Sequence, residues 1–163
     1  MELDQDKSLR EHLLYLLRGG GAHLDFETVI KDFPAESINR EIAHLPYTAW
    51  QLLEHMRIAQ SDILEFSRSA LHVSPDWPKG YWPESAREAL ASDWNKSVEA
   101  FRRDLAAMES LVADTSINLF EPLAHGEGQT VLREALLVAD HNAYHLGALV
   151  NIKRILMATD EAT

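Results

Sequence analysis

The sequence predicts an all-α fold, a four-helix bundle, from three observations. Apolar residues recur at helical spacing in four long stretches, and strand-like alternation does not occur. Long connectors separate these stretches, as in bundles that contain a crossover. With 163 residues, the chain can bury a substantial core, and we expect a single domain spanning residues 1–163.

Composition and charge exclude several classes of function. The formal net charge of −11 argues against nucleic acid and against an anionic membrane surface, since both call for a basic face. The chain has no cysteine, which excludes disulfides, thiolate zinc sites and cysteine nucleophiles. Its acidic start does not resemble a signal peptide, and no apolar run is long enough to span a bilayer. We therefore expect a soluble cytoplasmic protein.

The first helix is predicted at about residues 6–18, where leucines recur at helical spacing. The glycine run 19–21 ends it, because glycine readily takes the left-handed turn after a helix. Residues 22–46 are expected to form a long connector with one or two short helices, one of them capped by Asp25. The second long helix has a sharper start at Ala49, since Thr48 and Gln51 fit a capping box. It should end near residue 69.

The loop at residues 70–82 contains Pro75, Pro78 and Gly80, which disfavour regular structure. Fully extended, it reaches roughly 40 Å, so the third helix can run parallel to the second. That helix is predicted to begin at Pro83, a favoured first helical residue, and to end near residue 112. A second loop covers residues 114–129. The fourth helix is predicted at residues 130–157, and residues 158–163 are expected to fray.

The fourth helix carries two histidines, His141 and His145, one turn apart on one face. The same stripe contains Leu137, Leu149 and Ile152, so it should face the core. Imidazole there is costly unless its nitrogens find partners, and a divalent metal is one such partner. A pair at this spacing is by itself a weak signal. The alternative is a pair of hydrogen-bonded core histidines without metal.

A third histidine, His55, lies on the apolar face of the second helix with Leu52 and Ile58. Three histidine ligands would leave coordination positions open for water or substrate, which is typical of a catalytic metal site. Such a metal lowers the pKa of bound water or polarises a substrate oxygen. Three imidazoles suit zinc, nickel, iron or copper alike. We expect a divalent ion, with zinc or nickel favoured and iron a third option.

Two segments carry a family resemblance. Residues 50–57 (WQLLEHMR) and 140–147 (DHNAYHLG) resemble the two signature segments of the DinB-like superfamily, and residues 126–130 (GEGQT) also resemble it. The resemblance implies an up-down-down-up four-helix bundle with a crossover between the second and third helices. It implies a divalent metal on His55, His141 and His145, and a homodimer.

The resemblance also implies a class of function. Characterised relatives include thiol-dependent transferases and isomerases, and some members are described as hydrolases. One hypothesis is therefore a metalloenzyme that binds a small-molecule substrate at the open coordination position. The other is a non-catalytic, stress-associated metal-binding bundle that works through its dimer surface. A deep pocket at the metal would favour the first, and exposed apolar groups in the first helix or in residues 71–82 would favour the second.

Several other polar and aromatic residues need an assignment. Asp140 is a candidate to orient a ligand imidazole, although a solvated carboxylate is the favoured interpretation. Tyr144 either lines the site or packs in the core, the second being favoured. His44 and His125 lie in connectors that could close over the metal. Glu54 is expected to be solvated. Three aromatic residues of the loop after the second helix are expected to pack on the bundle or to form a lid over the site: Trp77, Tyr81 and Trp82.

Overall fold

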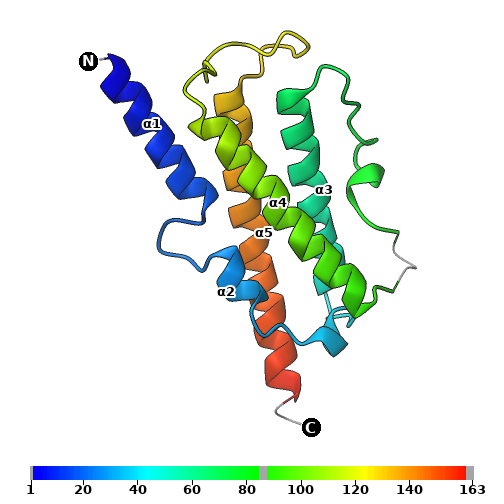
Figure 1. Ribbon diagram of the computed structural model, residues 1–163. Helices are drawn as coiled ribbons and strands as arrows, with labels where there is room; N and C mark the ends of the chain where they lie inside the picture. Colours follow the sequence, from blue (N-terminus) through cyan, green and yellow to red (C-terminus); the bar gives the residue numbers. More distant parts are fainter. Residues whose placement is uncertain (1, 85–87, 161–163) are drawn as a thin grey trace.

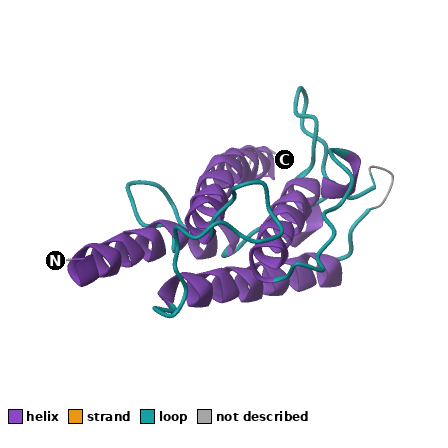
Figure 2. Ribbon diagram, turned by 90° about the horizontal axis from the view of Figure 1, so that it is seen from above, coloured by secondary structure: helices purple, strands orange, loops and turns teal. Residues whose placement is uncertain are grey.

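The computed structural model describes residues 2–84 and 88–160, and these residues form helices and loops without a β-strand. Figure 2, coloured by secondary structure, shows this directly. The predicted all-α class is confirmed. None of the described helices is both long enough and apolar enough to cross a membrane. There are four long helices and one short one in the described residues: α1 (Glu2–Leu17), α2 (Phe26–Ile30), α3 (Ala49–Arg68), α4 (Ala91–Ala113) and α5 (Val131–Asp160).

Figure 1 shows how the long helices are arranged. In this view α3 and α4 run from bottom to top, whereas α1 and α5 run from top to bottom. The segment between α3 and α4 returns along the length of α3 at the right of the figure. Helix α3 packs against both α4 and α5, and α1 packs against α4 and α5.

The core consists of two apolar clusters, one after the other along the helices. One cluster contains Leu52 and Met56 of α3 with Leu149 of α5, and the other contains Leu64 of α3 with Val138 of α5. A polar layer separates them. Along α3 and α5, Gln60, His141, Asn142 and His145 lie between the two clusters, and His55 joins this layer from a position next to Met56 of the first cluster.

The predicted helix ends are confirmed where the signal was local. Gly19 has a φ of 73°, and the Gly20 N–H donates to the Tyr15 carbonyl at 2.8 Å, which closes the end of α1. The Asp25 side chain caps α2 by accepting from the Thr28 N–H at 2.7 Å. Thr48 and Gln51 form both bonds of the capping box that starts α3.

The predicted start of the third long helix is wrong. Pro83 is not helical, residues 85–87 of the expected helix lie outside the described residues, and α4 begins at Ala91. The reason is a contact from far along the chain. The Asn39 side chain donates to the Ala89 carbonyl at 2.8 Å and accepts from the Ala89 N–H at 2.9 Å, which removes that residue's backbone from any helix. The Asp93 carboxylate then accepts from the Leu90 N–H at 3.1 Å.

The outer ends also differ from prediction. Helix α1 begins by Glu2 rather than near residue 6, and α5 extends to Asp160, so the expected fraying at residue 158 is wrong. The Thr159 hydroxyl donates to the Ile155 carbonyl at 2.6 Å within that last stretch of α5. Residues 161–163 of the expected frayed tail lie outside the described residues.

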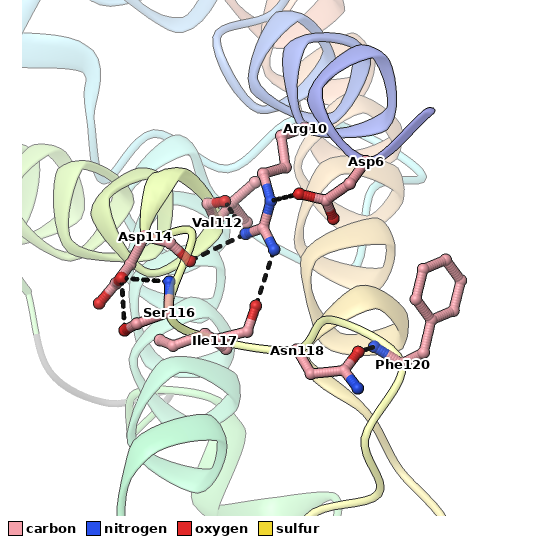
Figure 3. Close-up of polar contacts among 8 residues, drawn as sticks. All are labelled: Asp6, Arg10, Val112, Asp114, Ser116, Ile117, Asn118 and Phe120. Carbon is pink, nitrogen blue, oxygen red and sulfur yellow. Dashed lines mark hydrogen bonds and ion pairs between the residues drawn. The ribbon is translucent and has the colours of Figure 1, made fainter. Parts of the chain in front are cut away.

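Arg10 joins α1 to the end of α4, as Figure 3 shows. Arg10 is 6% exposed, and its guanidinium donates to the carbonyls of Val112 (2.7 Å), Asp114 (3.0 Å) and Ile117 (2.7 Å). Its Nε donates to the Asp6 carboxylate at 2.7 Å. The last carbonyls of a helix have no partners within the helix, so a cation placed there satisfies them and also faces the negative end of the helix dipole.

Candidate metal centre

The three predicted histidines lie together in the polar layer. His55 projects from α3, and His141 and His145 project from consecutive turns of α5. The Nε2 atom of His55 is 3.2 Å from the Nε2 atom of His141 and 3.2 Å from that of His145. Within the described part of the chain, this is the one group of three or more histidine or acidic side chains whose ligand atoms could hold a metal ion.

The tautomer of His55 follows from its second nitrogen. Its Nδ1 lies 2.8 Å from the carbonyl oxygen of Tyr81. A carbonyl can only accept, so Nδ1 carries the proton, and in the neutral ring Nε2 presents its lone pair to the other two histidines. That single lone pair can accept one hydrogen bond, yet two ring nitrogens face it. The protein atoms alone therefore leave the centre of the cluster unsatisfied.

The other two histidines are also short of partners. The Nδ1 atoms of His141 and His145 are buried and have no hydrogen-bond partner among the described residues. Burial, together with the nearby His55, lowers the pKa of His141 to about 4. Burial together with the two neighbouring histidines lowers the pKa of His145 to about 4. Burial also lowers the pKa of His55, against the effect of its bond to the Tyr81 carbonyl. All three rings are therefore neutral near pH 7, the form that binds metals.

The geometry fits a divalent ion. Two nitrogens bound at 2.0–2.1 Å with a tetrahedral angle between them are separated by about 3.3 Å. The two measured Nε2 separations of 3.2 Å agree with that value. Three neutral imidazole nitrogens without enough protein partners thus form a donor set suited to a first-row divalent metal.

An aromatic wall covers one side of the cluster. The indole of Trp82 stacks on the His55 ring with centroids 4.0 Å apart and planes 2° apart, and the Tyr47 ring stacks on the same indole with centroids 5.7 Å apart. Trp77 points away into solvent at 76% exposure. Of the three aromatic residues considered for a lid, Trp82 and the backbone of Tyr81 contact the site, and Trp77 does not.

Other residues near the histidines occupy different places from those expected. Tyr144 is 75% exposed, so the favoured assignment to the core is wrong, and its ring lies edge-on to His145 at 4.9 Å. Asp140 is exposed, and it does not orient an imidazole, since neither orphaned Nδ1 has a partner. Asn142 turns to the other side, where it donates to Gln60 at 2.8 Å.

The remaining candidates do not join the cluster. His44 is exposed in its connector, and the His125 ring instead bonds the Phe66 carbonyl at 2.7 Å, far along α3 from His55. Glu54 is not solvated as expected. Its side chain is 15% exposed, pairs with Arg57 at 2.7 Å and accepts from the Ser97 hydroxyl at 2.6 Å. It serves the contact between α3 and α4.

Two contributors were missed by sequence reasoning. The Tyr81 carbonyl is a backbone atom, which no side-chain pattern can reveal. Asp62 accepts from the Tyr81 hydroxyl at 2.6 Å, and it lies two helical turns after His55 on the same helix. The spacing of seven residues between His55 and Asp62 is a weak signal. It does place the Asp62 carboxylate on the helix face of His55, which is the pattern that sequence reasoning could have used.

The structure also contains an apolar cavity of about 420 Å³ between the end of α1, α2, α4 and α5. Met56, Asn142 and Leu146, each adjacent in sequence to one of the histidines, line it. None of the three histidines does so. The cavity and the histidine cluster are therefore separate features.

The comparisons with known proteins place the fold and the cluster in a family context. The family model described as the DinB superfamily matches residues 21–149, which include α2, α3, α4, most of α5 and all three histidines. No curated protein and no solved structure matches the chain. The family model therefore carries the assignment.

Proposed function

Because this chain belongs to the DinB superfamily, we propose that His55, His141 and His145 bind one divalent metal ion, and that the protein is a metalloenzyme of thiol-dependent transferase or hydrolase type. Zinc or nickel is the favoured ion, with iron as a third option. We further propose the finer features that accompany the family: one domain over residues 1–163, an up-down-down-up bundle with a crossover between α3 and α4, and a homodimer.

One observation carries the proposal. Three neutral imidazoles direct Nε2 atoms at a common point, and the one lone pair of His55 Nε2 cannot satisfy both neighbouring rings. Leaving polar atoms buried without partners costs free energy, so such an arrangement persists where a ligand satisfies it. The metal, when bound, supplies Lewis acidity toward a water or a substrate atom.

The residues around the histidines suggest where a small molecule would approach. Trp82 closes the His55 side of the cluster, whereas Tyr144 stands exposed beside His145. Three protein ligands leave at least one coordination position free. A substrate oxygen or a thiol sulfur would occupy that position from the Tyr144 side, and the Tyr144 ring would contact the rest of the substrate.

The test is elemental analysis of protein purified without an affinity tag, together with the His145→Ala variant. We expect one divalent ion per chain in the wild type and its loss in the variant. Full metal occupancy in His145→Ala would rule out the triad. A panel of thiol-transfer and hydrolysis assays on metal-loaded protein then tests the catalytic part, with His125→Ala as a matched control because His125 lies outside the cluster.

The second candidate function is a non-catalytic metal-binding bundle that acts through its surface. A specific observation favours it. Three apolar side chains of the segment between α3 and α4 are almost fully in solvent, namely Leu71 (92% exposed), Val73 (85%) and Trp77 (76%). Tyr15 of α1 is also exposed, at 57%. If Leu71→Ser with Val73→Ser changes the oligomeric state while every assay on wild-type protein stays at background, this second function is the correct one.

A further inference from the structure

Tyr81 contacts α3 at two points that lie two turns apart. Its backbone carbonyl accepts from His55 Nδ1 at 2.8 Å, and its hydroxyl donates to Asp62 at 2.6 Å. Seven residues of α-helix span about 10.5 Å. One residue of the segment between α3 and α4 thus reaches from the candidate metal ligand to a carboxylate further along the same helix.

Both oxygens of the Asp62 carboxylate bind residues of the segment between α3 and α4. One oxygen accepts from the Tyr81 hydroxyl, and the other lies 2.7 Å from His72 Nε2. The Asp62 side chain is 11% exposed. Burial and Asp62 raise the pKa of Tyr81 to about 12, while Ser74 acts in the opposite direction, so the phenol stays protonated and keeps donating. The segment is therefore fixed to α3 on both sides of its turn, at residue 72 and at residue 81.

We propose that Asp62 is a positioning residue for the metal centre: by anchoring Tyr81 it holds the carbonyl that fixes His55 in the Nδ1–H form, with Nε2 directed at the metal position. The inference rests on the proposed function for the metal itself. The effect on the tautomer of His55 does not depend on any metal. Asp62 does not touch the ion and acts through Tyr81.

The packing around Tyr81 explains why an anchor is needed. The residue ends a short 3-10 turn, Lys79–Tyr81, and the next helix among the described residues begins at Ala91. The next residue, Trp82, stacks on His55, so a shift of Tyr81 would also displace the ring that covers the ligand. A carbonyl that moves by about 1 Å no longer makes a good hydrogen bond, and the His55 ring would then populate both tautomers.

The experiment compares two carboxylate-to-amide changes on α3. Asp62→Asn keeps the volume but cannot accept from both Tyr81 and His72 through carboxylate oxygens. Glu65→Gln is the matched control, since the Glu65 side chain pairs with Arg68 on the exposed side of the same helix. Two quantities are measured: the His55 tautomer in metal-free protein, by long-range proton–nitrogen NMR of the imidazole rings, and the zinc dissociation constant, by competition with a coloured chelator.

We expect a single Nδ1–H tautomer for His55 in the wild type and in Glu65→Gln, and a mixture in Asp62→Asn. Zinc should bind about tenfold more weakly to Asp62→Asn, the low end for loss of an outer hydrogen bond to a metal ligand. It should bind Glu65→Gln as it binds the wild type. An unchanged tautomer and an unchanged zinc constant in Asp62→Asn would overturn the proposal.

The two measurements separate this inference from the proposed function. If wild-type protein binds none of zinc, nickel and iron but Asp62→Asn still mixes the tautomers, the metal proposal fails and the positioning role stands. If Asp62→Asn does not fold, Tyr81→Phe replaces it, because that variant keeps the His72–Asp62 contact and loses only the hydroxyl anchor. A Tyr81→Phe protein with the wild-type tautomer and zinc affinity would likewise overturn the positioning role.

Discussion

Two buried polar centres of this protein differ in how completely their hydrogen-bonding groups are used. At the end of α4, Arg10 makes four hydrogen bonds, three of them to carbonyls (Figure 3). In the middle of the bundle, His141 and His145 each keep a buried nitrogen without a partner, and their Nε2 atoms share one lone pair of His55. The first centre is complete, and the second is not.

The difference separates groups that stabilise the fold from groups that bind a ligand. A buried polar group that is fully paired contributes to stability, whereas one left unpaired costs about 1–3 kcal/mol. A protein keeps the second kind where something else completes it. The two centres should therefore respond in opposite ways to substitution and to metal.

The largest effect is expected from Arg10→Ala. It leaves three carbonyls at and just beyond the end of α4 without their donor, one of them buried, so the free energy of unfolding should fall by about 3 kcal/mol. Chemical denaturation of the wild type and the variant measures this change in the free energy of unfolding. Metal affinity should not change.

A matched arginine controls for this result. Arg18 also connects the α1 region to α4, through Glu109 at 2.7 Å, but its side chain is 61% exposed. Arg18→Ala should cost less than about 1 kcal/mol, as expected for exposed ion pairs. Equal losses in the two variants would mean that completeness of the Arg10 contacts is not what stabilises the end of α4.

The next effect is the response of the histidine cluster to metal. A ligand that binds only the folded state stabilises it by about 2.7 kcal/mol when its free concentration is 100 times the dissociation constant. We expect zinc or nickel to raise the unfolding midpoint of the wild type and of Arg10→Ala alike. In His141→Ala the increase should disappear. An increase that survives in this variant would place the metal elsewhere on the protein.

The contrast between the two centres also shows what could be predicted from sequence. His141 and His145 were found because ligands one helical turn apart leave a local pattern, and the capping box at Thr48 was found for the same reason. His55 required only its apolar helix face and the family resemblance. These signals all lie within single helices.

The features that were missed depend on contacts between distant residues. Arg10 finds its carbonyls more than 100 residues away, and Asn39 keeps Ala89 out of the expected helix by binding it across 50 residues. The Tyr81 carbonyl carries no side-chain signature. Pro83 is a favoured helix start, yet this local preference is weaker than two hydrogen bonds from elsewhere in the fold.

A smaller effect is expected from pH on the metal-free protein. His141 and His145 have a pKa of about 4 when folded and about 6.5 when unfolded, so below pH 6.5 the unfolded chain binds more protons. Stability is therefore complete above pH 6.5 and falls as the pH drops toward 4. Allowing for partial exposure, we expect a loss of about 1 kcal/mol for each histidine between pH 6.5 and 5.

Denaturation curves at several pH values test this loss, with His141→Gln as the comparison. Glutamine does not titrate, so the slope of stability against pH should be shallower in the variant. Arg10→Ala should keep the wild-type slope, because this substitution leaves the histidine cluster unchanged. If the slope is the same in the wild type and in His141→Gln, His141 takes up a proton as readily in the folded protein as in the unfolded chain.

The smallest effect on stability is expected from Asp6→Asn, which tests whether the ion pair with Asp6 contributes to the stability that Arg10 provides. Among the described residues Asp6 supplies the carboxylate that Arg10 contacts, but its side chain is 38% exposed and lies one turn away on the same helix. Such pairs contribute about 0.5 kcal/mol or less, and asparagine still offers an oxygen to Nε. The unfolding free energy should therefore hardly change, in contrast to Arg10→Ala. A loss close to that of Arg10→Ala would mean that the ion pair, and not the three carbonyls at the end of α4, holds the guanidinium in place.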